Sequence, residues 1–387
     1  MRAVNCTTHL PVLCSVSAYP NSLYHPGKLS LSFCALSTAK GMILIMKKIA
    51  LIFMALLLSL SLTGCGDKAV TTSGGDQKIV IKYTHGSPET DPHQWTALKF
   101  KELVGKYSNG KVEVTIFPSG QLGSEQRGFQ DVQNNVVQAT SLAINNATVY
   151  SPSMGIFDLP YLFKSREEAY KVIDGLWTDS GDKMIKESGN RPIIWFEEGF
   201  RVLSNSKKEV KQMSDMKGLK IRVPQNALML GAFKSWGASP TPISWDETFN
   251  ALQQGVVDGQ ENPYPIINSN KMYEVQKYIT DIHYKLWVGA VVVNEKWLQG
   301  LSADVREAIL KAGKEASIAE RDYIQGVEKE AKDNLIAKGM VFSGTPVDED
   351  VWMKNAMGIW PDYYDKIGGT ELLEKAMKIL GREMPKK

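Results

Sequence analysis

Short apolar strands and amphipathic helices alternate along the chain from residue 79 onward. Strands are predicted over residues 79–83, 111–117 and 139–144, where β-branched and apolar residues cluster or alternate with polar ones. Between them, apolar residues at helical spacing predict helices over 92–107 and near 125–137. Strands that alternate with helices indicate an α/β fold, in which mostly parallel sheets carry helices on their faces.

The same alternation continues through the middle of the chain. Ser165 with Glu168, and Ser244 with Glu247, have the spacing of capping boxes, and each pair predicts the start of a helix. Further strands are predicted at 193–196, 219–223, 256–258, 277–282 and 287–293, with a further helix at 226–236.

A long stretch without proline runs from residue 302 to residue 338. Apolar residues recur through it at helical spacing, and Gly339 stands where a helix C-terminus favours glycine. A helix of about 36 residues would be roughly 54 Å long. One small domain cannot bury such a helix along its whole length, and the 387-residue chain is long enough for two domains. We therefore expect the helix to lie across two domains.

Charged residues are distributed unevenly. Residues 1–65 hold all four cysteines, five basic residues and no acidic residue, which leaves 40 Lys and Arg against 42 Asp and Glu in the remainder. A nucleic-acid-binding protein needs a basic surface, and the remainder has no excess of basic charge. Because no cysteine follows residue 65, the remainder contains no disulfide, no cysteine nucleophile and no cysteine metal site.

Residues 46–64 have the pattern of a secretory signal peptide. Lys47 and Lys48 form a basic start, and the apolar run over 49–62 is shorter than the ~20 residues of a membrane-spanning helix. The Leu-Thr-Gly-Cys sequence that follows resembles the bacterial lipobox. That resemblance implies a lipoprotein whose first mature residue, Cys65, carries a lipid as its membrane anchor. The alternative is an uncleaved anchor helix.

The segments on either side of this signal differ in character. Residues 1–45 show no clear periodicity, and a signal belongs at an N-terminus, so we interpret them as an over-extended reading frame with the true start at Met46 or Met42. Residues 65–78 are polar and rich in Gly, Ser and Thr, which predicts a flexible tether between the lipidated cysteine and the fold.

Motifs of common enzyme classes are absent from the sequence. It has no Walker A loop, no Gly-x-Gly-x-x-Gly and no Gly-x-Ser-x-Gly motif. His85 and His93 flank a polar loop, but their spacing is no recognised metal pattern. The adjacent Glu197 and Glu198 are interpreted as solvated surface charges rather than as an acid–base pair. The sequence therefore predicts no cofactor, no metal and no catalytic residue.

Three polar residues instead stand at predicted strand ends, beside turns. They are Arg201, Arg222 and Asn262, and ligands of open α/β sheets bind beyond the carboxyl ends of strands. Arg222 closes an apolar strand just before Pro224, and its guanidinium fork matches a carboxylate in two parallel hydrogen bonds. The alternative for Arg222 is a surface ion pair of little energetic consequence.

Several longer segments resemble one known family. LKIRVP, GASPTPISWDETFNALQQGVVDGQENP and KMYEVQKYI, together with FPSGQLGSE and DLPYLF upstream, resemble the substrate-binding proteins of tripartite ATP-independent periplasmic (TRAP) transporters, the DctP family. The resemblance covers essentially all of residues 79–380.

The resemblance implies a two-lobed periplasmic-binding-protein-like fold of the Venus-flytrap type, with a long spine helix shared by both lobes. Lobe I is expected to comprise residues 79–198 plus 288–325, and lobe II residues 199–287 plus 326–387. The helix predicted over 302–338 matches the spine helix of the family.

The resemblance also implies a ligand site. Arg222 matches the family arginine that pairs with the substrate carboxylate, Asn262 the asparagine that helps to hold it, and Arg201 a second, more variable basic contact. Trp245 falls where the family often places an aromatic side chain against the ligand. Three further positions line the face of the other lobe in relatives: Glu125, Asn145 and His85.

The function implied is that of an extracytoplasmic solute-binding receptor, held at the membrane by its lipid. It captures a small carboxylate solute and delivers it to the small and large TRAP membrane subunits, with no chemical transformation. The alternatives are a receptor for a sensory membrane kinase and, less favoured, an organic-acid-processing enzyme. The sequence does not identify the solute; Trp245 and Trp287 either favour a flat, bulky ligand or belong to the core.

Overall fold

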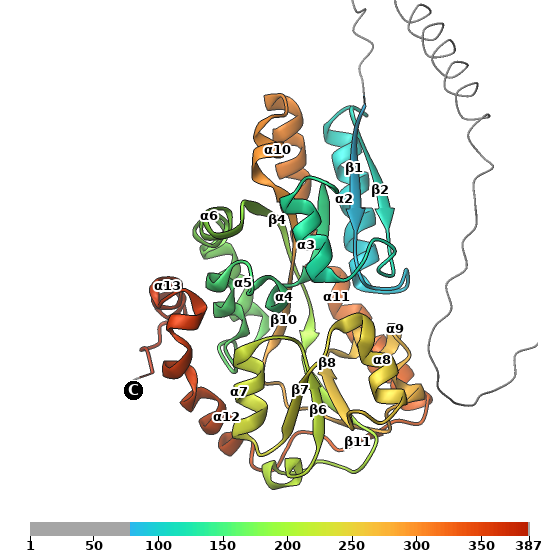
Figure 1. Cartoon of the computed structure of the whole chain (residues 1–387), viewed down its shortest axis with the longest axis vertical. Coiled ribbons are helices and arrows are strands. Elements are labelled where there is room, and N and C mark those ends of the chain that lie inside the picture. Colours follow the sequence, from blue (N-terminus) through green and yellow to red (C-terminus); the bar gives the residue numbers. More distant parts are fainter. Residues whose placement is uncertain (1–77, 386–387) are drawn as a thin grey trace, which may run out of the picture. The chain divides into compact units, whose positions relative to one another are not determined.

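The computed structural model of the chain describes residues 78–385 (Figure 1). The predicted over-extended segment 1–45, the signal peptide 46–64 and the lipidated Cys65 lie outside the described residues, as does the tether up to residue 77. Of the helices that are described, none is long and apolar enough to cross a membrane. The described part is a mixed α/β structure with two sheets, as expected for a two-lobed periplasmic-binding fold.

The first sheet has five strands in the order β2-β1-β3-β10-β4. Strand β10 runs antiparallel to both neighbours, and the other four strands share one direction, so the expected mostly parallel sheet is present. The strands are β1 (Ile79–Thr84), β2 (Val112–Phe117), β3 (Ala139–Ala143), β4 (Asn190–Phe200) and β10 (Leu286–Asn294).

Helices surround this first sheet. Ser165 caps one of them by accepting a hydrogen bond from the backbone N–H of Glu168, but Glu168 accepts from the N–H of Lys164, so the predicted capping box closes one residue early. The helices are α2 (Pro92–Tyr107), α3 (Glu125–Gln133), α4 (Ile144–Ala147), η1 (Pro152–Asp158), α5 (Arg166–Gly175), α6 (Trp177–Ser188) and α10 (Glu295–Gln299).

The second sheet has six strands in the order β11-β9-β5-β8-β6-β7, with β5 as its reversed strand. The strand predicted at 256–258 is wrong: Val256 is exposed, and the strand is β8, whose polar residues are buried. The strands are β5 (Val202–Asn205), β6 (Lys220–Val223), β7 (Ser239–Pro242), β8 (Gly259–Asn262), β9 (Tyr278–Thr280) and β11 (Val341–Phe342).

The second capping box is also wrong in detail. The Ser244 hydroxyl donates to the carboxylate of Glu247 and accepts no backbone N–H. The helices that follow the strands of the second sheet are α7 (Ala227–Ser235), α8 (Trp245–Gln253) and α9 (Tyr264–Ser269), with 3₁₀ turns η2 (Met213–Met216) and η3 (Met272–Glu274).

The chain passes between the two sheets at adjacent points. Strand β4 leads directly into β5 at Arg201, and the segment between β9 and β10 returns to the first sheet. The backbone N–H of Arg201 donates to the carbonyl of Lys285 at 2.9 Å, so the two connections lie side by side. We refer to these two connections, around residues 201 and 281–285, as the hinge.

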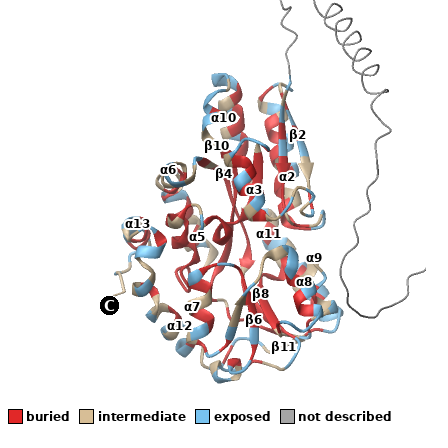
Figure 2. Cartoon of the chain, viewed as in Figure 1, coloured by how far each residue is buried: buried red, intermediate tan, exposed pale blue. Residues whose placement is uncertain are grey.

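The long helix predicted over 302–338 is α11 (Ala303–Ala337), a helix of 35 residues. Its first half contributes Val305 and Ile309 to a hydrophobic cluster of the first sheet, and its second half contributes Ala331 and Leu335 to a cluster of the second. The helix therefore joins both lobes, and the buried interior of each lobe lies against it (Figure 2).

The C-terminal segment departs from the expected division of the lobes. Residues 326–387 were all expected in lobe II, but the last helix, α13 (Glu371–Leu380), packs against α5 of the first lobe through Leu373 and Ala376. The apolar face of α13 is buried there because the chain crosses back once more after α12 (Glu349–Gly358) and the turns η4 (Trp360–Tyr363) and η5 (Asp365–Ile367).

Candidate functional site

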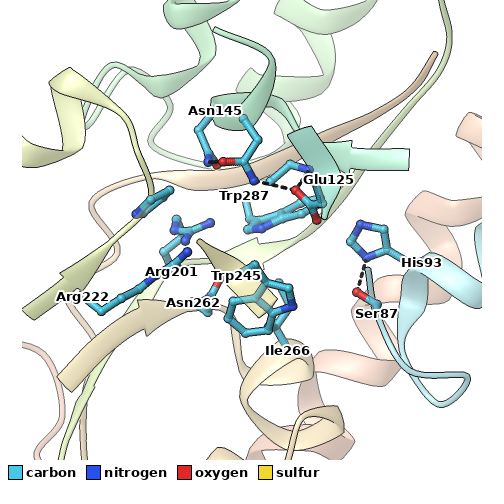
Figure 3. A pocket seen from close by; sticks show the side chains of 13 residues that line it. Ser87, His93, Glu125, Asn145, Arg201, Arg222, Trp245, Asn262, Ile266 and Trp287 are labelled. Atoms are coloured by element: carbon cyan, nitrogen blue, oxygen red, sulfur yellow. Dashed lines mark hydrogen bonds between the residues drawn. The ribbon is translucent and has the colours of Figure 1, made fainter. Parts of the chain in front are cut away.

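A small polar pocket lies between the two lobes (Figure 3). The cavity itself has a volume of only about 20 Å³, so its walls lie close together in this structure. The first lobe contributes its walls from the loop after β1 and from α3 and α4, and the second from the ends of β6 and β8 and the start of α8. Six of the seven predicted ligand contacts line this pocket: Arg222, Asn262, Arg201, Trp245, Glu125 and Asn145.

Arg222 presents a buried guanidinium to this pocket. The residue is 2% exposed, and its Nε donates to the carbonyl of Ile243 at 2.9 Å. No described carboxylate forms an ion pair with it. Burial lowers the pKa of Arg222 to about 10; the charge of Arg201 acts in the same direction, while Glu261 opposes it. The group is therefore a cation at neutral pH whose remaining N–H donors have no protein acceptor in the described chain.

Arg201 is equally buried but differently engaged. Its Nη2 donates to Oε1 of Glu261 at 2.8 Å and to the Glu261 carbonyl at 2.9 Å, and its Nε also donates to the same carboxylate. Burial opposes the charge of Arg201, but Glu261 holds its pKa above the ordinary value. Only Nη1 is left without a hydrogen bond, so Arg201 offers the pocket one donor rather than a complete fork.

Asn262 and Trp245 line the pocket beside Arg222 (Figure 3). Arg222 lies opposite Gln260 in the parallel pair of β6 and β8, which brings Asn262, two residues further along, to the pocket. The Nδ2 of Asn262 donates to Oε1 of Gln260 at 2.7 Å. The ring of Trp245 lies 5.6 Å from the guanidinium of Arg222, within cation–π range.

Glu125 and Asn145 line the facing wall, from the first lobe. Glu125 begins α3 and accepts hydrogen bonds at Oε2 from Nδ2 of Asn146, at 2.6 Å, and from the N–H of Ala143, at 3.1 Å. Burial raises the pKa of Glu125. Asn145 donates to the side chain of Asn146 at 3.0 Å, so Glu125 and both asparagines form one hydrogen-bonded group.

His85 does not line the pocket, contrary to the prediction. Its Nε2 contacts Gln94 at 2.9 Å, and its ring stacks on His93 at 6.0 Å between centroids, which places it behind the wall. Burial and the neighbouring charge of His93 lower the pKa of His85 to about 4. The pocket-lining residues that the sequence analysis did not assign to the ligand site include Ser87, His93, Asn146, Ile266 and Trp287.

Trp287 belongs to the core and to the pocket at once. It is buried within a cluster of the first lobe, and its ring meets that of His93 edge-on at 5.2 Å. The core alternative is confirmed, and a preference for a flat, bulky ligand stays a prediction.

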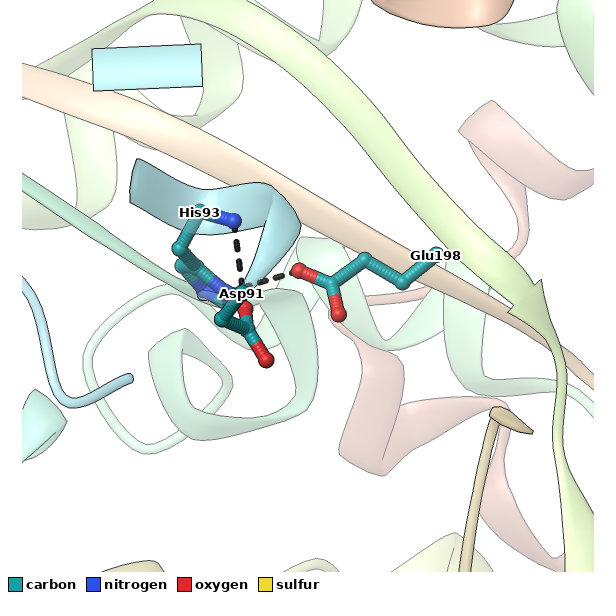
Figure 4. Close-up of side chains that lie close together, drawn as sticks. All are labelled: Asp91, His93 and Glu198. Carbon is teal, nitrogen blue, oxygen red and sulfur yellow. Dashed lines mark hydrogen bonds and ion pairs between the residues drawn. The ribbon is translucent and has the colours of Figure 1, made fainter. Parts of the chain in front are cut away.

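Glu197 and Glu198 are buried, so their interpretation as solvated surface charges was wrong. They lie on β4, where the strand passes beneath the spine helix. Oε1 of Glu198 lies 2.7 Å from Nδ1 of His93, and Oδ1 of Asp91 lies 3.0 Å from the same nitrogen (Figure 4). We call these three residues the His93 cluster. Burial and the charge of Asp91 raise the pKa of Glu198 to about 8.

Among the described residues, the side chains of the His93 cluster lie close enough together to hold a metal ion. Oδ1 of Asp91, at 3.0 Å, forms a hydrogen bond with Nδ1, and Oε1 of Glu198, at 2.7 Å, forms an ion pair with the ring. Nδ1 has one hydrogen for two acidic neighbours, and neither oxygen of Glu198 makes a hydrogen bond with a described residue.

The two lobes touch beside the pocket. Nδ2 of Asn226, at the start of α7, donates to Asp158 of the first lobe at 2.8 Å. The hydroxyl of Ser269, at the end of α9, donates to Oδ2 of Asp91 at 2.6 Å. These hydrogen bonds join segments that follow strands of different sheets, so the lobes are drawn together over the pocket.

Comparison with known proteins decides the family. The model of the DctP family, bacterial extracellular solute-binding protein family 7, matches residues 83–367. The chain belongs to this family. It is therefore a TRAP-type solute-binding protein of the DctP family rather than an enzyme, and the family description places such proteins outside the cytoplasm.

Three relatives illustrate the similarity. The C4-dicarboxylate-binding periplasmic protein DctP of Rhodobacter capsulatus is 33% identical over 70% of this chain and 79% of its own length. A TRAP periplasmic solute-binding protein of Rhodobacter sphaeroides, in an open apo crystal structure, is 40% identical over 79% of this chain and 99% of its own, with a TM-score of 0.68. The sugar-acid-binding protein DctPAm of Advenella mimigardefordensis, in complex with galactonate, is 28% identical over 79% and 98%, with a TM-score of 0.75.

For the two solved structures, the order of the TM-scores is the reverse of the order of the sequence identities. The ligand-bound relative superposes better than the open one although its sequence is less similar. That order agrees with the hydrogen bonds between the lobes, which bring the pocket walls together in this structure.

Proposed function

We propose that the protein captures a small organic acid by its carboxylate, outside the cytoplasm, and delivers it to the membrane subunits of a TRAP transporter. Family membership supports the receptor role, and the relatives that bind C4-dicarboxylates and galactonate support an organic acid as the solute. In this proposal the carboxylate contacts are Arg222, Asn262, Arg201 and Trp245, and Glu125 and Asn145 face the rest of the solute.

The observation that carries the proposal is the buried, unpaired guanidinium of Arg222. A cation removed from water is costly unless an anion compensates it, and no described side chain supplies that anion. A carboxylate satisfies both needs, because it brings the missing charge and accepts two parallel N–H bonds from the fork. The amide of Asn262 and the free Nη1 of Arg201 supply further donors beside it.

Binding and closure are coupled in this mechanism. The solute enters between separated lobes, and Arg222 takes its carboxylate while water still fills the cleft. The lobes then rotate about the hinge, which expels water and lowers the local dielectric, so the ion pair strengthens. The contacts between Asn226 and Asp158 and between Ser269 and Asp91 then hold the lobes together.

Calorimetry on an arginine variant tests the carboxylate anchor. A thermal-shift screen of organic acids first finds a binder, since a ligand at 100 times its dissociation constant adds about 2.7 kcal/mol of stability. Arg222→Ala is then expected to lose at least about 3 kcal/mol of binding free energy, the lower end for truncating one partner of a buried charge pair. Arg191→Ala, which removes an arginine paired with Glu295 away from the pocket lining, is the matched control and binds normally. An unchanged dissociation constant for Arg222→Ala contradicts the proposal.

Delivery to a transporter is the finer part of the proposal, and a sensory membrane kinase is the rival recipient. Uptake of the solute into vesicles that contain the small and large TRAP membrane subunits is expected to require this protein and an ion gradient. Uptake that is independent of the protein, with kinase activity that depends on it, favours the sensory role.

We further propose that a lipid on Cys65 holds the protein at the outer face of the cytoplasmic membrane after removal of residues 46–64. The sequence pattern supports this, and those residues lie outside the described structure. Cys65→Ser is expected to release the protein from washed membranes, with a shift in mass that accounts for the missing lipid. A wild-type protein without lipid at Cys65 contradicts the proposal.

A further inference from the structure

His93 is fixed in the pocket wall opposite Arg222 (Figure 3). It lies in the first turn of α2, where Asp91 caps the helix by accepting the backbone N–H of His93. Its ring meets those of Phe196 and Trp287 edge-on, with centroids 5.1 and 5.2 Å away. The imidazole is therefore held in one orientation by aromatic neighbours and by its own helix terminus.

One edge of this ring is fully used by the protein. Nδ1 contacts the hydroxyl of Ser87 at 3.1 Å and faces the carboxylates of Asp91 and Glu198. The carboxylate of Asp91 only accepts hydrogen bonds, so Nδ1 carries a hydrogen, and the negative charge of Asp91 favours a second proton on the ring. In agreement, burial alone would lower the pKa of His93, but Glu198 and Asp91 raise it well above the ordinary value.

The other edge of the ring is left without a partner. Nε2 is buried and makes no hydrogen bond with any described residue. In the imidazolium form Nε2 is a charged donor, and leaving such a group buried and unpaired is costly. Across the pocket, the guanidinium of Arg222 is also buried and also has N–H donors without an acceptor. One bound molecule that spans the pocket supplies an acceptor to each of the two residues.

The charges around His93 limit which chemical group of the solute can accept a hydrogen bond from Nε2. His93 is already balanced by Asp91, whose pKa is lowered by the hydrogen bond and charge of His93 despite its burial. Glu125 stands on the same wall, with both of its hydrogen bonds at Oε2, so Oε1 is free to accept from the pocket. The wall thus offers one donor and one acceptor with no net positive charge, which suits a hydroxyl group and disfavours a second carboxylate.

We propose that His93 is a specificity-determining residue, whose Nε2–H donates to a hydroxyl oxygen at the end of the solute remote from Arg222, and that the pocket therefore selects hydroxylated monocarboxylates over dicarboxylates. Glu125 accepts the hydrogen of a hydroxyl on the same part of the solute. This inference rests on the proposed capture of a carboxylate by Arg222 and adds the class of acid that is captured.

Two matched sets of acids test the selection. The four-carbon set is erythronate, butyrate and succinate, and the six-carbon set is gluconate, hexanoate and adipate. Within each set the first carboxylate and the chain length are constant, and only the far end changes. In calorimetry, the hydroxylated acid of at least one set is expected to bind the wild-type protein at least about tenfold more tightly than its two partners, in line with one charged hydrogen bond.

Two variants separate the donor from the structural role of the ring. His93→Asn keeps a hydrogen-bonding atom near the Nδ1 position but removes Nε2, whereas His93→Gln restores an N–H near the Nε2 position. We expect His93→Asn to lose about tenfold or more in affinity for the preferred hydroxylated acid, with affinity for the unsubstituted acid unchanged within about twofold. His93→Gln is expected to recover part of the loss. Melting temperatures and circular dichroism verify that both variants fold.

Several outcomes overturn this inference. The first is a wild-type protein that binds the dicarboxylate or the unsubstituted acid at least as well as the hydroxylated acid of the same set. The second is a His93→Asn variant with unchanged selectivity. The third is binding that EDTA abolishes. None of these outcomes bears on the anchor. Failure of the carboxylate proposal is recognised separately, by an Arg222→Ala variant that binds every acid as the wild type does.

Discussion

The hinge and the pocket both bury charged side chains, but those at the hinge have ion-pair partners and Arg222 in the pocket has none among the described residues. At the hinge Arg201 is held by the Glu261 carboxylate, and Lys285 forms an ion pair with Asp158. In the pocket Arg222 is just as buried and has no described ion-pair partner. The hinge charges are satisfied within the chain and hold the connections together, whereas the pocket charge is the one proposed to bind the solute.

This difference separates two arginines that both stand at predicted strand ends, of which Arg222 was the stronger candidate. Arg201 and Arg222 both follow the pattern of a basic residue at a strand end, and both are 2% exposed. They differ in their partners. The guanidinium of Arg201 is held by Glu261 and leaves only Nη1 for the solute, whereas that of Arg222 has no ion-pair partner among the described residues.

The largest expected effect comes from breaking the hinge pair. Arg201→Met leaves the carboxylate of Glu261 buried with only the hydroxyl of Tyr284 as a side-chain donor. We expect a loss of about 3–5 kcal/mol in the free energy of unfolding, measured by urea denaturation. Arg191→Met breaks a more exposed ion pair with Glu295, and its cost is expected to stay below about 1 kcal/mol. Equal losses in the two variants would erase the distinction between buried and exposed pairs.

The His93 cluster gives the next largest effect, through pH. The pKa of Glu198 is raised to about 8, from an ordinary value of 4.5, so between these values the native protein holds a proton that the unfolded chain has released. Stability therefore falls as pH rises from 6.5 to 8, by up to about 1.4 kcal/mol per pH unit for this proton. The raised pKa of His93 acts in the same direction.

Glu198→Gln isolates this contribution. The amide copies the neutral carboxyl group but does not titrate, so the fall in melting temperature between pH 6.5 and 8 is expected to become shallower. His85 has its pKa lowered to about 4 and adds the opposite slope only below about pH 6.5, outside the window tested. An unchanged slope in Glu198→Gln refutes the assignment.

A smaller and opposite effect is expected at Arg222. Arg222→Met removes a buried charge that no described residue compensates, so the protein without solute should become about 1 kcal/mol more stable to urea. The same variant should lose acid binding. A gain of stability together with a loss of binding distinguishes Arg222 from Arg201. An Arg222→Met variant that is destabilised would show that both arginines stabilise the fold.

The smallest expected effect concerns the aromatic neighbour of Arg222. Trp245→Leu keeps apolar volume but removes the ring that lies 5.6 Å from the guanidinium. Affinity for the acid is expected to fall by about 0.5–1 kcal/mol, the size of a cation–π contact at a partly exposed site. Phe249→Leu, on the same helix and outside the pocket lining, serves as the control and leaves affinity unchanged.

Much of the fold was predictable from the sequence because it depends on regular periodicity. The spine helix was placed within one residue at each end, since its apolar spacing and Gly339 are local signals. Strand β8 was misplaced because its buried residues, Gln260 and Glu261, are polar, and burial of polar residues depends on partners elsewhere in the chain.

Arg222, the proposed anchor, and Glu125 and Asn145 of the facing wall were all singled out from the sequence, but His93 was not. Arg222 stands beside Pro224 at the end of an apolar strand, which marks it locally. His93 and Glu198 are far apart in sequence, and their contact arises only when α2 packs over β4. A Glu-Glu pair looks like surface from sequence alone, because nothing nearby indicates that the spine helix will cover it.

The most direct test of the account is a crystal structure of the protein with its preferred acid bound. The account predicts the solute carboxylate at about 3 Å from both terminal nitrogens of Arg222, in the bidentate geometry of a guanidinium–carboxylate pair. An uncharged group at that position, or a guanidinium of Arg222 turned out into solvent, would contradict it.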